Sequence, residues 1–379
     1  MENFTYQCQT KIIFGKKTED KVGEETEKFS NKILLHYGTG SIKKTGLYDR
    51  IVKSLNNHNI KFIELSGVVP NPRLDLVNKG IKICRENNIN FILAIGGGSV
   101  IDSAKTIAAG YYYQGDVWDF FTKRISITKT LPIGVVLTIP AAGSESSPNA
   151  VITKNEQKLA ITSDQLRPQF AILNPELTFS LPLNQTVAGI ADMFAHIVER
   201  YFTNTKNTDL TDKLCEATFR SIIKNARLVI KNPDNYDCRG EIMLAGNIAH
   251  NGILGVGRNE DWASHRIEHQ LSAIYDVTHG EGLAVIVPAW MKYVYKHDIN
   301  RFVQYANKVW GIKGNGEKTA LKGIAATKEF FKELGLPKTL KELNIDDTKF
   351  NIMAKKSSPT GNFVKLNEKD VLEIYRMAL

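Results

Sequence analysis

Histidines gather in one part of the chain. His196, His250, His265, His269 and His279 lie between positions 196 and 279, although the 379 residues include only eight histidines. His265 and His269 are four residues apart, a spacing that places two side chains on one face of a helix. Imidazole nitrogens are common ligands of zinc and iron(II). The pattern therefore predicts a divalent transition-metal site.

Asp192 and His196 have the same four-residue spacing, and His279 precedes a glycine at a predicted helix break. One carboxylate with two or three imidazoles suits zinc or iron(II). The alternative is a group of structural histidines without a metal. Glu268 immediately precedes His269, so the segment is not the His-Glu-x-x-His motif, and a zinc protease is disfavoured.

A run of three glycines, Gly96-Gly97-Gly98, stands between a predicted strand and a predicted helix and is followed by Ser99 and Asp102. Glycines let the backbone approach a diphosphate closely, and the N-terminus of the helix attracts its charge. The sequence is neither the G-x-G-x-x-G fingerprint nor a Walker A loop. A tight turn without a ligand is the alternative interpretation.

A second turn, with Gly38, Gly40 and Ser41, follows the first predicted strand. A dinucleotide-binding fold reads the adenosine ribose at such a position, and selection for a free 2′-hydroxyl usually requires a carboxylate there. Gly38 occupies that place, while Ser41, Lys43 and Lys44 could receive a 2′-phosphate. The pattern favours NADP(H) over NAD(H), the alternative being a capped helix with two solvated lysines.

Small residues follow a further predicted strand, Ile133 to Ile139. The carboxyl ends of strands form the ligand crevice in an open α/β sheet. We therefore expect Thr138, Ser144 and Ser146 to line the nicotinamide side.

The first half of the chain alternates strand-like and helix-like segments. Its strands are apolar throughout, which indicates a parallel sheet covered on both faces. We expect strands at 32–37, 61–65, 91–95 and 133–139, helices after Ser41 and over 74–88, and a hairpin of 151–153 with 158–162.

Helical segments dominate after residue 183. The sequence therefore predicts a dinucleotide-binding α/β domain over 1–183 and an all-α, metal-binding domain over 184–379.

The bulk composition is that of a globular protein. No apolar run is long enough to span a membrane, and the N-terminus lacks a signal-peptide pattern, so we expect a cytoplasmic protein. The four cysteines are scattered, which favours reduced thiols. The net charge of +9 arises from dispersed lysines, and no nucleic-acid-binding motif is present.

Several segments, taken together and in order, resemble the iron-containing (group III) alcohol dehydrogenases, in the branch of butanol dehydrogenases and broad aldehyde reductases. The similar segments span nearly the whole chain. They are 37–43, 67–72, 94–102, 137–145, 192–196, 261–271 and 279–280.

The resemblance implies the dehydroquinate synthase-like fold of that family, with an active site in a cleft between the two domains and a homodimeric assembly. By the same resemblance, His269 is a non-ligand histidine beside the nicotinamide, Lys158 lies near the cofactor, and Gly38 stands where NAD-preferring relatives carry aspartate. Ala142 is a departure from the family pattern, which often has threonine at this position of the loop. The implied metal ligands, for Fe²⁺ or Zn²⁺, are Asp192, His196, His265 and His279.

The expected reaction is hydride transfer between a nicotinamide dinucleotide and a small alcohol or aldehyde, with His269 as a proton relay. A glycerol dehydrogenase-like polyol enzyme or a dehydroquinate-synthase-like lyase on the same scaffold is the first alternative. A basic nucleic-acid-binding protein is the second, and it leaves the glycines and histidines unexplained.

Overall fold

The computed structural model describes residues 1–123 and 125–379. Their contacts divide the chain into two compact units, one of Gln7–Leu181 and one of Met1–Tyr6 with Pro182–Leu379. The predicted domains, 1–183 and 184–379, differ from these units in assigning the first six residues to the α/β part and in placing the boundary slightly later.

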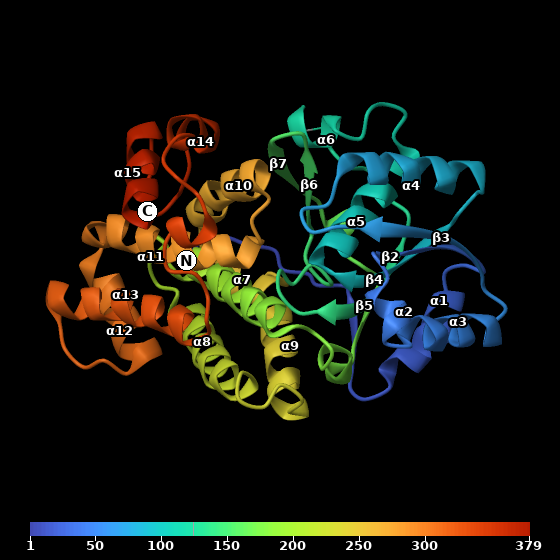
Figure 1. The fold of residues 1–379 in the computed structure, drawn as a ribbon, viewed down its shortest axis with the longest axis horizontal. Coiled ribbons are helices and arrows are strands. Elements are labelled where there is room, and N and C mark those ends of the chain that lie inside the picture. Colours follow the sequence, from blue (N-terminus) through green and yellow to red (C-terminus); the bar gives the residue numbers. More distant parts are fainter. Residues whose placement is uncertain (124) are drawn as a thin grey trace. The chain divides into compact units, whose positions relative to one another are not determined.

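A six-stranded parallel sheet forms the centre of the α/β unit, in the order β1-β8-β5-β4-β2-β3 (Figure 1). Strands β2 and β4 are buried along almost their whole length, which explains why they lack polar alternation. The strands are β1 (Lys11–Phe14), β2 (Lys32–Gly38), β3 (Lys61–Val68), β4 (Phe91–Gly97), β5 (Ile133–Ile139) and β8 (Phe170–Leu173).

Helices connect these strands, and a separate antiparallel hairpin follows β5. The hairpin consists of β6 (Asn149–Lys154) and β7 (Gln157–Thr162). The helices are α1 (Val22–Glu27), α2 (Ser41–Lys44), α3 (Leu47–Asn57), α4 (Leu74–Glu86), α5 (Gly98–Tyr112) and α6 (Asp119–Thr122).

The predicted parallel sheet and hairpin are confirmed, and two strands were missed. β1 and β8 have four residues each and pair with one another in parallel. Runs this short carry no periodicity that distinguishes them from loops. The helix expected from Ser41 onward is interrupted at Gly46, which has a φ of 72° and separates α2 from α3.

The second unit is built from packed helices. They are α7 (Leu183–Tyr201), α8 (Asp209–Val229), α9 (Tyr236–His250), α10 (Ala263–Tyr275), α11 (His279–Val294), α12 (Ile299–Trp310), α13 (Gly316–Glu333), α14 (Phe350–Ser357) and α15 (Glu368–Ala378). The predicted helical character of this half is thereby confirmed.

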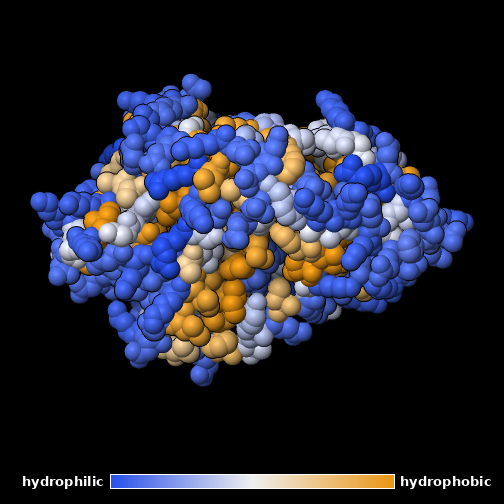
Figure 2. Space-filling view, turned by 90° about the horizontal axis from the view of Figure 1, so that it is seen from below, coloured by the Kyte–Doolittle hydropathy of each residue, from blue (hydrophilic) through white to orange (hydrophobic). Residues whose placement is uncertain are grey.

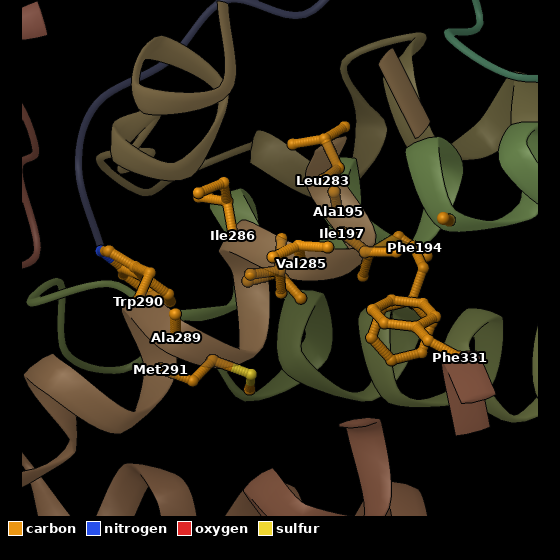
Figure 3. Close-up of a cluster of buried hydrophobic side chains, with 14 of the residues drawn as sticks. Phe194, Ala195, Ile197, Leu283, Val285, Ile286, Ala289, Trp290, Met291 and Phe331 are labelled. Carbon is orange, nitrogen blue, oxygen red and sulfur yellow. The ribbon is translucent and has the colours of Figure 1, made fainter. Parts of the chain in front are cut away.

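The core of the helical unit centres on α7 and α11. Figure 3 shows Phe194 and Ile197 of α7 beside Val285 and Ile286 of α11, with Phe331 of α13 packed edge-on against Phe194. All five side chains are almost completely buried. Burial of each contributes about 1.5–3 kcal/mol, so this packing fixes the two helices firmly against each other.

Among the described residues, none of the helices is both long and apolar enough to cross a membrane. The four cysteines are all free thiols. Hydrophobic residues nevertheless reach the surface on the face shown in Figure 2.

Candidate metal centre and dinucleotide site

Helix α7 carries the first part of the histidine cluster. Asp192, His196 and Glu199 recur at intervals of four and three residues, so they lie on one side of the helix. All three side chains are buried, with exposed fractions of 7%, 4% and 0%. A buried carboxylate pair and imidazole on one helix face require partners from other helices.

Helix α10 supplies the next histidine, and a buried aspartate holds the start of that helix. Asp261 accepts hydrogen bonds from the backbone N–H groups of Ala263, Asn362 and Phe363. Burial and the neighbouring charge of Glu199 raise the pKa of Asp261 to about 7. The hydrogen bonds of Asp261 fix the start of α10, and His265 in the first turn of this helix faces Asp192 of α7.

Helix α11 begins at His279, and its second residue lies directly against α7. A Cβ on Gly280 would stand 1.9 Å from the carbonyl oxygen of Ala188, closer than any side chain tolerates. The glycine therefore allows the first turn of α11, with His279, to approach the backbone of α7 one turn before Asp192.

The three helices bring the four predicted ligands together around one oxygen atom. Asp192 Oδ1 is 3.3 Å from Nε2 of His196, and 3.9 Å from Nε2 of both His265 and His279. Donor atoms of Asp192, His265 and His279 all lie within 4.8 Å of one another. His196 is outside that set, although it is nearest to Asp192.

These separations suit a shared metal ion. Two donors that are each about 2.1 Å from a tetrahedral metal stand roughly 3.4 Å apart. Asp192 Oδ1 and His265 Nε2 are buried and have no hydrogen-bond partner among the described residues. Unsatisfied buried polar atoms are costly, so two of them facing each other fit a site completed by a cation.

Electrostatics around the cluster also favour a cation. Burial lowers the pKa of His265, but the carboxylates of Asp192 and Glu199 outweigh it and raise that pKa to about 9. The pKa of His196 lies well below its usual value because burial and the nearby imidazoles disfavour its charged form. The neutral imidazole of His196, 3.3 Å from the Asp192 carboxylate, can accept a positive ion.

Two buried glutamates, for which the sequence predicted no role, contact the Nδ1 atoms of His265 and His279. Glu199 Oε1 is 2.9 Å from Nδ1 of His265 and accepts a 2.6 Å hydrogen bond from the Ser264 hydroxyl. Glu268 bonds Nδ1 of His279 in the same way. Each bond leaves Nε2 free to face Asp192, the arrangement that orients metal-binding imidazoles. Each glutamate follows a histidine, His196 or His265, by three residues, and this spacing is the sequence signal that could have pointed to them.

A second group of close donors consists of Glu268, His269 and His279. Glu268 is fully buried, and its two oxygens already accept from Ser272 Oγ and face His279 Nδ1. The His269 ring centroid is 5.5 Å from that of His279. This geometry places His269 beside the cluster, with the Glu268 carboxylate occupied by other partners.

His250, one of the five grouped histidines, also lies in the cluster, although no metal or cofactor role was predicted for it. Its ring centroid is 4.0 Å from that of His196 and 5.6 Å from that of Trp262. Trp262 in turn packs against His265 at 5.3 Å. The imidazole of His196 therefore packs against the neighbouring rings of His250, Trp262 and His265.

In the α/β unit, the three glycines lie at the turn from β4 into α5, as predicted. A Cβ on Gly96 would stand 2.5 Å from Val100, and one on Gly97 would stand 2.9 Å from Ile139. Close packing alone thus requires the first two glycines. Gly98 and Ser99 are partly exposed at the N-terminus of α5, where a 15-residue helix offers free N–H groups.

Two residues expected to contact the cofactor, Asp102 and Ser144, form hydrogen bonds within the unit. Asp102 accepts from Ser144 Oγ at 2.6 Å and from the Val151 N–H at 2.9 Å. The buried Lys105 donates to Ser144 Oγ at 3.0 Å and to the carbonyls of Ser147 and Asn149. This network ties the segment after β5 to α5.

The remaining predicted contacts vary in exposure. Thr138 is partly exposed at the end of β5, whereas Ser146 is completely buried. The contacts expected of these residues with the nicotinamide stay predictions. Lys158 is buried on the hairpin and donates to Asn71 Oδ1 at 3.0 Å.

The turn after β2 is partly open to solvent. Gly38 ends β2, which lies beside the glycine-rich strand β4. Gly40 has a φ of 119° and precedes the exposed Ser41, whose hydroxyl does not cap α2.

A parallel sheet with a glycine-rich strand–helix turn, together with a buried cluster of one carboxylate and several imidazoles, is typical of metal-dependent dehydrogenases. Comparison with known families agrees with this class. The model described as "Iron-containing alcohol dehydrogenase" matches residues 9–175, and the one described as "Fe-containing alcohol dehydrogenase family, C-terminal" matches residues 186–379. The chain belongs to the iron-containing alcohol dehydrogenase family.

Individual relatives cover the whole chain. NADH-dependent butanol dehydrogenase A of Clostridium acetobutylicum is 44% identical, with 99% of each chain covered. NADPH-dependent aldehyde reductase YqhD of Escherichia coli is 36% identical over 95% of this chain and 94% of its own. The crystal structure of a Thermotoga maritima NADH-dependent butanol dehydrogenase A has a TM-score of 0.97 at 41% identity. The match covers 100% of this chain and 99% of that structure's chain. The predicted family, fold and oxidoreductase class are confirmed.

Proposed function

We propose that Asp192, His196, His265 and His279 hold one divalent metal ion, Fe²⁺ or Zn²⁺. The observation that carries the proposal is the convergence of three imidazole Nε2 atoms on Asp192 Oδ1, which is buried and has no hydrogen-bond partner in the described part of the chain. Oxygen and nitrogen donors of this kind suit both metals, so the donor set does not choose between them.

We infer that the dinucleotide diphosphate binds at the turn of Gly96, Gly97 and Gly98. The support is the exposed N-terminus of α5 directly after the buried strand β4. The adenosine ribose then belongs at the end of the neighbouring strand, with Gly38, Gly40 and Ser41. Ser99 and Thr138 are the other partly exposed candidates for cofactor contacts.

The preference for NADP(H) inferred from Gly38 is not supported by the relatives. Two of the three proteins named above are called NADH-dependent, and they are the more similar ones. We therefore propose that the chain uses NAD(H) in preference to NADP(H).

When bound, the metal would polarise the substrate oxygen, and the nicotinamide would give or accept the hydride. The chain's own residues position these groups. Glu199 and Glu268 fix the imidazoles of His265 and His279, and the burial of the cluster limits access of water. His269, which is partly exposed beside His279, is the proposed relay for the proton of the alcohol.

The proposed substrates are short- to medium-chain alcohols and aldehydes such as butanol and butyraldehyde. The test is oxidation of NADH and NADPH by protein reconstituted with Fe²⁺ or Zn²⁺, against a panel of C2–C6 aldehydes. We expect turnover of butyraldehyde that requires metal and is lost in His265→Ala. Activity with glycerol alone would indicate the polyol enzyme instead, and full activity and metal content in His265→Ala would contradict the metal centre.

The homodimer and the cytoplasmic location expected from the sequence stay proposals. Exposed leucines on α8 and α9, namely Leu210, Leu214 and Leu244, support an association surface. Light scattering coupled to size-exclusion chromatography tests the dimer, and cell fractionation tests the location.

A further inference from the structure

A carboxylate from the neighbouring strand faces the turn after β2. Glu64 lies on β3, the edge strand next to β2, and its side chain is 35% exposed. It accepts hydrogen bonds from the hydroxyls of Tyr37 and Tyr48 and from Lys43 Nζ, the last at 3.3 Å. Three donors from β2, α2 and α3 thus converge on one exposed carboxylate.

Lys43 is held tightly in this group. Its Nζ is 4.5 Å from the ring centroid of Tyr48 and 5.4 Å from that of Tyr37, in addition to its ion pair with Glu64. Cation–π contacts and a carboxylate together restrict a side chain that would otherwise move freely. Lys43 is therefore not available as a free cation.

The charge of Glu64 persists at neutral pH. Partial burial raises its pKa, but the hydrogen bonds from the two tyrosines and from Lys43 outweigh burial and hold the pKa below its usual value. The positive charge of Lys43 is therefore compensated by Glu64, whereas the sequence alone shows only the adjacent lysines Lys43 and Lys44.

The cluster stands where a dinucleotide fold distinguishes its two cofactors. The glycine turn follows β4, and β2 lies directly beside β4, with Tyr37 paired to Ile95. The adenosine ribose is read at the end of such a neighbouring strand. Tyr37 is the residue before Gly38, and Lys43 N–H donates to the carbonyl of Gly40 in the turn.

We propose that Glu64 determines the preference for NAD(H), because it pairs with Lys43 and so removes a cation that could otherwise bind a 2′-phosphate. This inference rests on the proposed function and adds the residue that selects the cofactor. A lysine that is already paired with a carboxylate attracts an anionic ligand less than a free lysine does. The carboxylate missing at Gly38 is thus replaced by one from the adjacent strand, acting through Lys43.

The test compares the affinities of wild type, Glu64→Gln, Lys43→Gln and the double variant for NADH and NADPH, measured by fluorescence titration. Calorimetry with 2′,5′-ADP and 5′-ADP gives a second readout that needs neither metal nor substrate. We expect Glu64→Gln to raise the ratio of NADPH to NADH affinity about tenfold, and adding Lys43→Gln to abolish that gain. Glu64→Ala repeats the test with a smaller side chain.

Glu24→Gln is the matched control, since Glu24 is an exposed glutamate of the same unit that pairs with Lys28 at 3.5 Å. Its affinity ratio should equal that of the wild type. Three outcomes would overturn this inference and leave the proposed function standing. They are an unchanged affinity ratio in both Glu64 variants, an equal change of the ratio in Glu24→Gln, and a gain in the ratio that survives loss of Lys43. A gain of the last kind would assign the phosphate to the adjacent, exposed Lys44. A wild type that binds neither dinucleotide would overturn the proposed function and this inference with it.

Discussion

Replacing Glu199 by glutamine should weaken metal binding without removing a ligand. Glu199 Oε1 receives three hydrogen bonds, from Ser264 Oγ, from His265 N–H and from His265 Nδ1. Glutamine has nearly the same shape, but it lacks the charge and its amide nitrogen cannot accept a hydrogen bond. The substitution therefore tests the charge behind His265 rather than the packing.

The magnitude follows from the perturbation of His265. The pKa of His265 rises to about 9 although burial lowers it, so this net rise, about 3 kcal/mol in favour of a positive charge on the ring, is a lower bound for the two carboxylates together. A share of about half for Glu199 corresponds to at least about tenfold in affinity for a cation. Outer carboxylates that orient metal-bound histidines contribute about 10- to 100-fold in general.

The assay is competition for Zn²⁺ between the protein and a chromophoric chelator at pH 7.5. We expect the dissociation constant to rise about 10- to 100-fold in Glu199→Gln. Glu216→Gln is the control, because Glu216 is a buried glutamate of the same unit that accepts from Tyr201 and Gln304. Equal metal affinity in wild type and Glu199→Gln, or an equal loss in Glu216→Gln, would refute the reasoning.

Three other outcomes are expected. Gly280→Ala should destabilise the protein by about 1–3 kcal/mol, because its Cβ would overlap the Ala188 carbonyl, and should lower the metal content by displacing His279; thermal unfolding and elemental analysis check this. His269→Ala should lower kcat about 100-fold while metal content stays that of the wild type, and loss of the metal would instead make His269 a ligand. Burial lowers the pKa of His36 to about 4, so the unfolded chain binds more protons between pH 4 and 6.5, and stability falls as the pH falls through that range. At pH 5 the loss is about 2 kcal/mol relative to pH 8; urea unfolding should show this loss in the wild type and a smaller one in His36→Gln.

Much of the fold could be predicted from the sequence because its signals are local. Apolar runs such as 91–95 and 133–139 are strands in the structure, since a parallel sheet buried on both faces admits no polar alternation. Likewise, the glycines after Ile95 indicated a tight strand–helix turn. β1 and β8 escaped prediction because four residues form a strand only when neighbouring strands provide their hydrogen bonds.

The sequence by itself determined the residue types of the candidate metal centre, since Asp192 and His196, and likewise His265 and His269, are four residues apart, a spacing that puts two side chains on one helix face. Only the tertiary structure decided how these donors are oriented. Glu199 fixes a histidine of α10, and Glu268 fixes one of α11, through contacts between residues 66 and 11 positions apart.

The pairing of Glu64 with Lys43 was equally invisible in the sequence. The two residues are 21 positions apart, and their contact depends on β3 lying beside β2. Charges and hydrogen bonds act over a few ångströms in space, and spacing along the chain predicts that proximity only within a single helix or strand. For that reason the sequence shows two adjacent lysines at the turn after β2, whereas the structure shows that one of them is already neutralised.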